Sequence, residues 1–237
     1  MIFENFSEKI SSLKHVSKDL DLNEVSQKFE MYFNILVEEN EKYNLTAITE
    51  KEEVYLKHFY DSLYILNYFY LDKLSVLDIG SGAGFPGIPL AIVCKNTKLY
   101  LCEPTTKRAK FLEMVAQKLN LKNVKVINKR AEELDNTYRE FFDVVTSRAV
   151  SALNIIMELS VPFVKVNSWF IPFKGSSGRE EIETSKSAAK TLKVTLERVE
   201  EYELEQNLCR TLIFFKKSAK TAHKYPRNYS LIKSKSL

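Results

Sequence analysis

Cysteine and histidine are scarce in this chain of 237 residues, which contains only three of each. Cys94, Cys102 and Cys209 are odd in number and share no Cys-x-x-Cys spacing, so we expect neither a disulfide framework nor a zinc site. The three histidines are scattered along the chain, which also argues against a bound metal. We therefore expect the cysteines to be small buried apolar residues in a reducing compartment.

Long hydrophobic runs are missing as well. The longest uncharged run, 79–94, is short for a membrane span and is interrupted by glycine and proline. The first residues, MIFENFSEK, include acids where a secretory signal would have basic residues followed by an apolar stretch. With 45% hydrophobic and 28% charged residues, the composition predicts a soluble protein with a sizeable core, and we expect it to be cytoplasmic, without a membrane partner.

Acidic residues are absent after Glu205. The segment 206–237 has a net charge of +8, whereas residues 1–205 have 27 basic and 31 acidic residues and a net charge of −4. A basic arm on a mildly acidic body predicts a polyanionic partner, and the alternative is a solvated, disordered tail. The residues that we expect to contact phosphates are Lys216, Lys217, Lys220, Lys224 and Arg227.

The first part of the chain, residues 1–72, reads as a helical segment. Apolar residues recur at helical spacing in 23–40, and Thr49-Glu50-Lys51-Glu52 resembles a capping box that opens a helix running through Tyr68. Between these helices, 43–46 is expected to form a loop. An aromatic and aliphatic stripe on the second helix is expected to belong to the core: Tyr55, Phe59, Leu63 and Leu66.

Residues 73–217 follow a different pattern, in which short apolar runs alternate with helical stretches. This alternation predicts an α/β domain with a mostly parallel sheet covered by helices on both faces. The last two strands, 192–202 and 208–216, have no helix between them and are expected to form an antiparallel hairpin at the edge of the sheet. Residues 218–237 are left as a basic C-terminal tail. The expected helices lie at 86–95, 105–119, 131–139, 151–163 and 179–190.

Glycine is also scarce, and four of the six glycines fall within residues 80–87. They follow the apolar run SVLDI, and GAGFPG at 82–87 matches the Gly-x-Gly-x-x-Gly pattern of dinucleotide-binding folds. In those folds the turn holds a pyrophosphate, which a carboxylate at the end of the strand would repel. Asp78 occupies that position, so it favours a ligand without phosphate and with a cationic end. S-adenosylmethionine, with its ammonium and sulfonium groups, has these properties.

Glu103 ends the next strand, KLYLCEP, where a carboxylate can accept hydrogen bonds from both hydroxyls of a ribose. Sites for NAD and for S-adenosylmethionine share this feature, so Glu103 indicates an adenosine ligand without choosing between them. The choice rests on Asp78 and on Gly80, Gly82 and Gly84, whose bare backbone lets the methionine portion approach. A nicotinamide-dependent oxidoreductase is therefore disfavoured, and the remaining alternative is a glycine turn that serves only packing.

Several short motifs occur in a fixed order between residues 43 and 227. They are YNLTAIT (43–49), His58 with Asp61-Ser62-Leu63, VLDIGSGAGFPGIPL (76–90), Lys107-Arg108, RAEE (130–133), SRAV (147–150) and YPR (225–227). With these motifs the chain resembles the rRNA small subunit methyltransferase G family, also called glucose-inhibited division protein B. One small departure is Glu103, because relatives often have aspartate at that position, and either carboxylate can hold a ribose.

The resemblance implies a Rossmann-like methyltransferase fold and the methylation of guanine N7 in 16S rRNA, alone or in the small ribosomal subunit. The cofactor would be S-adenosylmethionine, with no metal, and the enzyme is expected to be a monomer. The alternatives are a methyltransferase acting on another RNA, a protein or a small molecule, and a non-catalytic RNA-binding module with the same fold.

The resemblance also implies cofactor contacts at Gly80, Phe85, Ala131, Glu132 and Arg148. Phe85, just after the glycines, can wall the site, and Ala131 with Glu132 would lie at the adenine edge after the third strand. The alternatives are an ordinary helix start for the Ala131-Glu132 pair and a surface arginine for Arg148.

Methylation at guanine N7 needs no strong general base, because N7 carries a free lone pair. His58 is therefore not assigned as a base, and no catalytic residue is identified. Lys174 and Lys107-Arg108 are candidates for phosphate contacts, or equally solvated charges. Arginine prefers to bind both O6 and N7 of guanine, which would mask N7, so we expect Arg148 to reach only O6 or to serve the cofactor.

Overall fold

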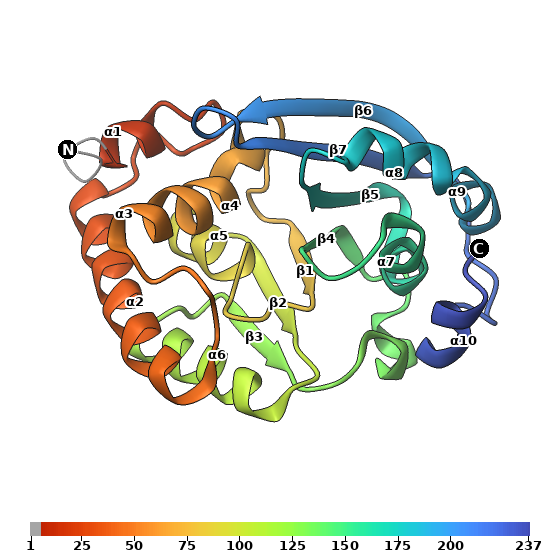
Figure 1. Cartoon of the computed structure of the whole chain (residues 1–237), viewed down its shortest axis with the longest axis horizontal. Coiled ribbons are helices and arrows are strands. Elements are labelled where there is room, and N and C mark those ends of the chain that lie inside the picture. Colours follow the sequence, from red (N-terminus) through yellow and green to blue (C-terminus); the bar gives the residue numbers. More distant parts are fainter. Residues whose placement is uncertain (1–5) are drawn as a thin grey trace. The chain divides into compact units, whose positions relative to one another are not determined.

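The computed structural model describes residues 6–237 (Figure 1). Seven strands follow the order β3-β2-β1-β4-β5-β7-β6. They are β1 (Ser75–Ile79), β2 (Lys98–Cys102), β3 (Val124–Ile127), β4 (Phe142–Arg148), β5 (Val164–Lys174), β6 (Val194–Glu203) and β7 (Cys209–Lys217). The pairs β1–β4, β2–β3 and β4–β5 are parallel, whereas β7 runs antiparallel to β5 and to β6. The predicted Rossmann-like sheet with an antiparallel edge hairpin is thus confirmed.

α-Helices separate successive strands from β1 to β6, except for β3 and β4, which are joined through 3₁₀ turns. The α-helices are α1 (Phe6–Ser11), α2 (Leu22–Tyr43), α3 (Lys51–Glu53), α4 (Asp61–Leu63), α5 (Gly87–Val93), α6 (Thr106–Lys118), α7 (Leu153–Ser160), α8 (Gly178–Thr184), α9 (Lys186–Leu192) and α10 (Tyr229–Ser234). α5, α6 and α7 confirm three of the predicted helices. Within residues 6–237, no helix has both the length and the apolar character needed to cross a membrane.

The chain forms two compact units. The described part of unit 1 comprises 6–74 and Ser81–Asn128, and unit 2 comprises Ser75–Gly80 and Lys129–Leu237. The glycine-rich stretch therefore begins in unit 2 and continues in unit 1.

The core of unit 1 is aromatic. Asp21 caps α2 by accepting hydrogen bonds from the backbone N–H groups of Asn23 and Glu24, which satisfies donors that a helix start leaves open. The stripe predicted to be core is buried, with exposed fractions of 3% or less: Tyr55, Phe59, Leu63 and Leu66.

The predicted capping box is wrong, because α3 begins after Glu50, whose side chain makes no capping hydrogen bond. The helix continues through a π-helical stretch, Val54–Tyr60, and ends in a 3₁₀ turn at Asn67.

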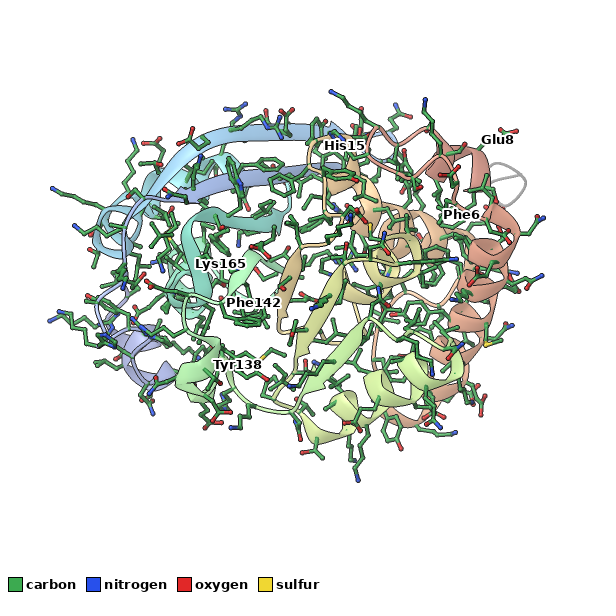
Figure 2. All side chains as sticks on the ribbon, turned by 180° about the vertical axis from the view of Figure 1, so that it is seen from behind. Phe6, Glu8, His15, Tyr138, Phe142 and Lys165 are labelled. Carbon is green, nitrogen blue, oxygen red and sulfur yellow. The ribbon has the colours of Figure 1, made fainter. Side chains whose placement is uncertain are left out.

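Two predicted helices of unit 2 differ in the structure. Residues 131–139 form two 3₁₀ turns instead of one helix, because Leu134 is extended and buries its side chain. Tyr138, at the end of the second turn, stacks on Phe142 with a ring-centroid distance of 5.9 Å (Figure 2). The helix predicted at 179–190 is broken into α8 and α9 at Ser185, whose hydroxyl donates to the Ile182 carbonyl. Such a bond competes with helix continuation.

The cysteines are all free, and they differ in exposure. Cys102 is buried and Cys94 partly buried, whereas Cys209 is exposed, so the expectation that all three are buried is wrong for Cys209. Burial, together with the negative charge of Asp72, raises the pKa of the Cys94 thiol to about 12. Cys94 is therefore an unreactive thiol at neutral pH.

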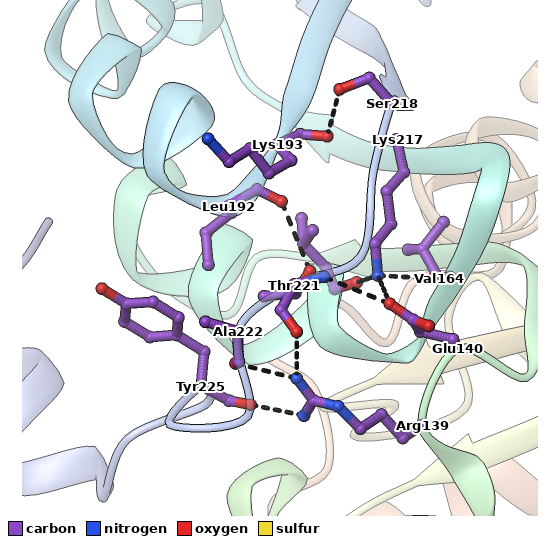
Figure 3. A network of polar contacts seen from close by, with 11 residues as sticks. Arg139, Glu140, Val164, Leu192, Lys193, Lys217, Ser218, Thr221, Ala222 and Tyr225 are labelled. Carbon is purple, nitrogen blue, oxygen red and sulfur yellow. Dashed lines mark hydrogen bonds and ion pairs between the residues drawn. The ribbon is translucent and has the colours of Figure 1, made fainter.

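The predicted phosphate contact is wrong for Lys217, the last residue of β7. Its side chain is fully buried, and its ammonium donates to Glu140 Oε1 at 3.1 Å and to the carbonyls of Val161 and Val164 at 3.1 and 2.9 Å (Figure 3). Burial lowers the pKa of the Lys217 ammonium, and Glu140 opposes this effect. An ammonium enclosed in this way cannot reach an RNA phosphate.

Arg227 and Lys174 are likewise engaged inside the protein. The Arg227 guanidinium donates to Glu158 at 2.7 Å through Nε and at 2.6 Å through Nη2, and Glu158, on α7, is fully buried. Lys174 donates to the Ser151 carbonyl and pairs with Glu181, both at 2.7 Å. Both side chains therefore form internal ion pairs and are not simply solvated charges, and the phosphate contact of Arg227 stays a prediction.

The C-terminal segment 218–237 is folded onto unit 2. Tyr225 is buried, α10 packs on α7, and the guanidinium of Arg139 donates to three carbonyls of the segment. The alternative of a disordered, solvated tail is thus wrong, because the tail has its own buried anchors. Lys220 and Lys224 remain exposed, and Lys216 lies over the Trp169 ring, so these three stay candidates for phosphate contact.

Candidate functional site

Asp78 lies at the carboxyl end of β1, within unit 2. β1 runs beside β4 in parallel, with Asp78 in register with Thr146, and the Asp78 side chain is fully buried. An ionised carboxylate in the interior is costly unless polar or cationic groups surround it. The strand therefore ends in a buried acid, at the edge of a parallel sheet where ligands usually bind.

Gly80 turns the chain away from β1. Its φ is +70°, a conformation that side chains disfavour, and a Cβ atom at this position would lie 2.7 Å from Cγ2 of Val150. Both the backbone conformation and the lack of space therefore require glycine here. The Val150 side chain therefore packs against the glycine that follows the Asp78 end of β1.

The rest of the turn belongs to unit 1 and is held by two distant residues. The N–H of Gly82 donates to Glu103 Oε2 at 2.9 Å. The hydroxyl of Tyr32, on α2, donates to the Ala83 carbonyl and occupies the space that a Cβ on Gly84 would need, 2.6 Å away. α2 thus supports the turn through Tyr32. Sequence reasoning missed Tyr32, because its helical spacing marks it only as a core residue.

Glu103 is buried at the end of β2, and backbone groups fix its carboxylate. Oε2 accepts the Gly82 N–H, and Oε1 accepts the Thr105 N–H at 2.8 Å. The Asn128 side-chain amide donates to the Glu103 carbonyl at 2.9 Å, which fixes the backbone as well. A carboxylate has about four acceptor positions, so capacity remains for the two hydroxyls of a ribose.

Phe85 is part of an aromatic cluster in unit 1. Its ring stacks on the His58 ring, with centroids 4.5 Å apart and planes 17° from parallel, and it lies 5.7 Å from the Tyr32 ring. His58 Nε2 is 2.8 Å from the Thr46 hydroxyl, so the YNLTAIT stretch and His58 pack directly behind the glycine turn. This geometry shows that His58 stacks on Phe85. It gives no indication that His58 transfers a proton.

The remaining predicted site residues lie in unit 2. Ala131 is buried and begins the 3₁₀ turn that follows Arg130, and Glu132 is half-buried beside it. Arg148 is the last residue of β4, two positions beyond the register partner of Asp78. Ala149 follows with φ of +55°, which is uncommon for a residue with a side chain and marks a tight turn.

Taken unit by unit, the predicted residues fall into two sets. Unit 2 holds Asp78, Gly80, Ala131, Glu132 and Arg148, and unit 1 holds Gly82, Phe85 and Glu103. Asp78 and Gly80 are joined to Gly82 through the chain itself, and Gly82 is bonded to Glu103. Within the part of the chain that the structure describes, no three His, Cys, Asp or Glu side chains are grouped so that they could hold a metal ion.

Comparison with known proteins gives a consistent family match. The family model for rRNA small subunit methyltransferase G matches residues 25–212. A "Ribosomal RNA small subunit methyltransferase G" from Mycoplasma capricolum is 47% identical over 216 residues, which is 91% of this chain and 93% of the relative. The protein of the same name from Carboxydothermus hydrogenoformans is 46% identical over 204 residues, or 85% and 87% of the two chains.

Solved structures share the fold at low sequence identity. A "SAM dependent methyltransferase" from Aquifex aeolicus aligns with a TM-score of 0.55 and 18% identity, over 69% of this chain and 92% of that chain. A 16S rRNA (adenine(1408)-N(1))-methyltransferase from Catenulisporales acidiphilia aligns with a TM-score of 0.52 and 13% identity, over 64% and 88% of the two chains. At these identities the likeness shows a common fold.

Proposed function

Because the chain belongs to the rRNA small subunit methyltransferase G family, we propose that it transfers a methyl group from S-adenosylmethionine to N7 of a guanine in 16S rRNA. The observation that carries this proposal is the glycine turn, which directly follows the buried Asp78 in the chain and whose Gly82 N–H donates to the buried Glu103. The reaction would place the enzyme in the cytoplasm, with naked 16S rRNA or the small subunit as its partner.

The cofactor fits the residues that are present. We assign the ammonium of the methionine portion to Asp78. The methionine portion would approach the backbone of Gly80 and Gly82, which have no side chains. The ribose hydroxyls are assigned to the acceptor positions that remain on Glu103. A dinucleotide fits less well, because its pyrophosphate would lie against the carboxylate of Asp78.

The adenine end and the wall of the site are assigned by family resemblance and by position. Ala131 offers a small side chain and backbone groups beside Glu132, which suits an adenine edge. Phe85, fixed by stacking on His58, would wall the site next to the turn. Arg148, at the carboxyl end of β4, would contact the cofactor or O6 of the guanine and leave N7 accessible.

For this reaction the protein mainly has to align guanine N7 with the methyl group of the cofactor. S-adenosylmethionine supplies a methyl group that is already activated by its sulfonium. The residues of this chain need to bind the guanine so that its N7 lone pair points along the line of the methyl–sulfur bond, and to exclude water from that line. This task requires rigid support, which Tyr32, Glu103 and His58 provide to the turn.

Purified protein and labelled S-adenosylmethionine test the proposal. We expect label in 16S rRNA when naked 16S rRNA, small subunits and whole ribosomes are offered separately. Nuclease digestion and mass spectrometry should identify the product as 7-methylguanosine. Label in a ribosomal protein or in a different nucleoside, or no label in any of the three substrates, would contradict the assigned reaction.

Methyl transfer should depend only weakly on pH. Because N7 needs no deprotonation, single-turnover rates should stay within a few-fold between about pH 6.5 and 9, the range at and above the usual pKa of histidine. The His58→Gln variant should keep the same flat profile, even if weaker packing behind Phe85 lowers its rate. A steep titration that disappears in this variant would show that His58 acts as a base.

A further inference from the structure

A hollow of about 550 Å³ that is lined mainly by charged and polar residues lies in unit 2, and the assigned methyl transfer does not account for it. The hollow is lined by the segment before β4, by the end of α9 and by the start of the C-terminal segment. Its charged and polar side chains include Arg139, Glu140, Lys193, Lys220, Thr221 and His223. Apolar side chains, which dominate most small-molecule sites, are nearly absent from this lining.

The walls of the hollow are held by hydrogen bonds (Figure 3). The Arg139 guanidinium donates to the carbonyls of Thr221 and Tyr225 at 2.7 Å and to that of Ala222 at 2.9 Å. Ser218 donates to the Lys193 carbonyl at 2.8 Å through its N–H and at 3.0 Å through its hydroxyl. The tail thus closes the end of α9, and hydrogen bonds within the protein fix the walls of the hollow.

The hollow carries an excess of positive charge. Glu140 is the acid in the lining, and its carboxylate accepts from the Lys217 ammonium at 3.1 Å and from the Thr221 N–H at 3.2 Å. Burial would raise the pKa of Glu140, but the Lys217 hydrogen bond and charge outweigh burial and lower it, so this acid stays ionised and neutralised.

The basic side chains of the lining are not neutralised in this way. The Arg139 guanidinium donates to carbonyls, which carry no net charge. Within residues 6–237, neither Lys193 nor Lys220 forms an ion pair, although the charge of Lys220 also contributes to lowering the pKa of Glu140. Asp135, next to Asn136 of the lining, is paired with Lys129. The lining therefore keeps the positive charges of Arg139, Lys193 and Lys220.

We propose that this hollow binds a backbone phosphate of the RNA substrate, as a contact separate from the site of methyl transfer. The proposal rests on the function proposed above. Arg139 and Glu140 precede β4, whereas Arg148 ends it, and the length of the strand between them spans about 20 Å. A small metabolite could not reach both ends of β4, but an RNA strand or helix can.

An RNA phosphate fits the hollow better than a free anion does. A phosphodiester lies within a chain of phosphates, and Lys224 continues the exposed basic residues beyond Lys220 along the tail, where the next phosphates of the same RNA strand would be bound. Phosphate contacts by lysine and arginine give affinity without reading the base sequence. The hollow would therefore fix the position of the RNA on unit 2 and leave base recognition to the methyl-transfer site.

The double variant Lys193→Gln/Lys220→Gln tests the proposal. Lys98→Gln/Lys122→Gln is the matched control, because it removes two exposed lysines of unit 1 that likewise lack ion pairs among the described residues. RNA affinity is measured by filter binding at several salt concentrations with small subunits or 16S rRNA. We expect the log–log salt slope of the test variant to flatten by about 0.7–0.9 for each lysine–phosphate interaction that is removed, while the control keeps the wild-type slope.

Two further measurements separate the possible outcomes. The test variant should raise KM for RNA several-fold, with kcat at saturating RNA and the affinity for S-adenosylmethionine unchanged. If the wild type methylates 16S rRNA and the test variant keeps both its slope and its KM, the hollow is not an RNA contact, even if inorganic phosphate binds there in a direct titration. If the wild type leaves RNA unlabelled, the proposed function itself fails, and the RNA contact fails with it.

Discussion

Replacing Arg227 with methionine should lower the free energy of unfolding by about 3–5 kcal/mol, the usual cost of removing one partner of a buried ion pair. Glu158 is fully buried and accepts three hydrogen bonds from Arg227: from the backbone N–H at 3.0 Å, from Nε at 2.7 Å and from Nη2 at 2.6 Å. Methionine fills similar space and supplies no charge, so the Glu158 carboxylate would be left without its cation. Urea denaturation followed by circular dichroism at pH 7 measures the change.

Two variants make this result specific. Lys224→Met removes a neighbouring charge of the same tail from an exposed position, and we expect a change within about 0.5 kcal/mol. The double variant Arg227→Met/Glu158→Leu should recover much of the stability, because an apolar pair of similar volume often replaces a buried ion pair without loss. If Arg227→Met keeps wild-type stability and instead flattens the salt slope of RNA binding, Arg227 is an RNA contact after all.

Replacing Asp78 with asparagine should weaken S-adenosylmethionine binding by about 1–3 kcal/mol, or roughly 5- to 150-fold. The substitution keeps the size of the side chain and removes the negative charge that we assign to the ammonium of the cofactor. Because Asp78 is buried, urea denaturation of the same variant is needed to separate an affinity change from a loss of folding stability. Calorimetric titration of the folded variant gives the affinity.

Asp19→Asn is the matched control for this titration. Asp19 is exposed and lies before α2, so its charge is screened by solvent and the variant should bind the cofactor as the wild type does. Wild-type affinity in a folded Asp78→Asn protein would overturn the role assigned to Asp78. An equal loss in both variants would point to a general effect of net charge instead.

Much of the fold was readable from the sequence, because its signals are local. The alternation of short apolar runs with helical stretches predicted the mostly parallel sheet of an α/β protein and located α5, α6 and the β6–β7 hairpin. The dense cluster of glycines predicted a tight turn, and positive φ angles at Gly80, Gly82 and Gly84 confirm it. The positions of Asp78 and Glu103 at strand ends followed from the same local pattern.

For the charges predicted to lie in the basic arm, the deciding interactions join residues far apart in the chain. Lys217 and Arg227 looked like tail charges because no acid follows Glu205. Their partners, Glu140 and Glu158, lie 77 and 69 residues earlier. The support of the glycine turn by Tyr32 spans 51 residues. Neither composition nor periodicity carries information on such pairs.

The sequence by itself therefore determined the class of fold, the turn at residues 80–84 and the family resemblance, since neighbouring residues encode strand, helix and turn. Only the tertiary structure decided which charges of the basic tail face solvent and which are buried against acids of the body. The physical reason is that burying a charge is favourable only where a distant partner compensates it, and long-range packing alone brings such partners together. Long-range packing also places Lys193 and Lys220, from separate parts of the chain, at the border of one hollow.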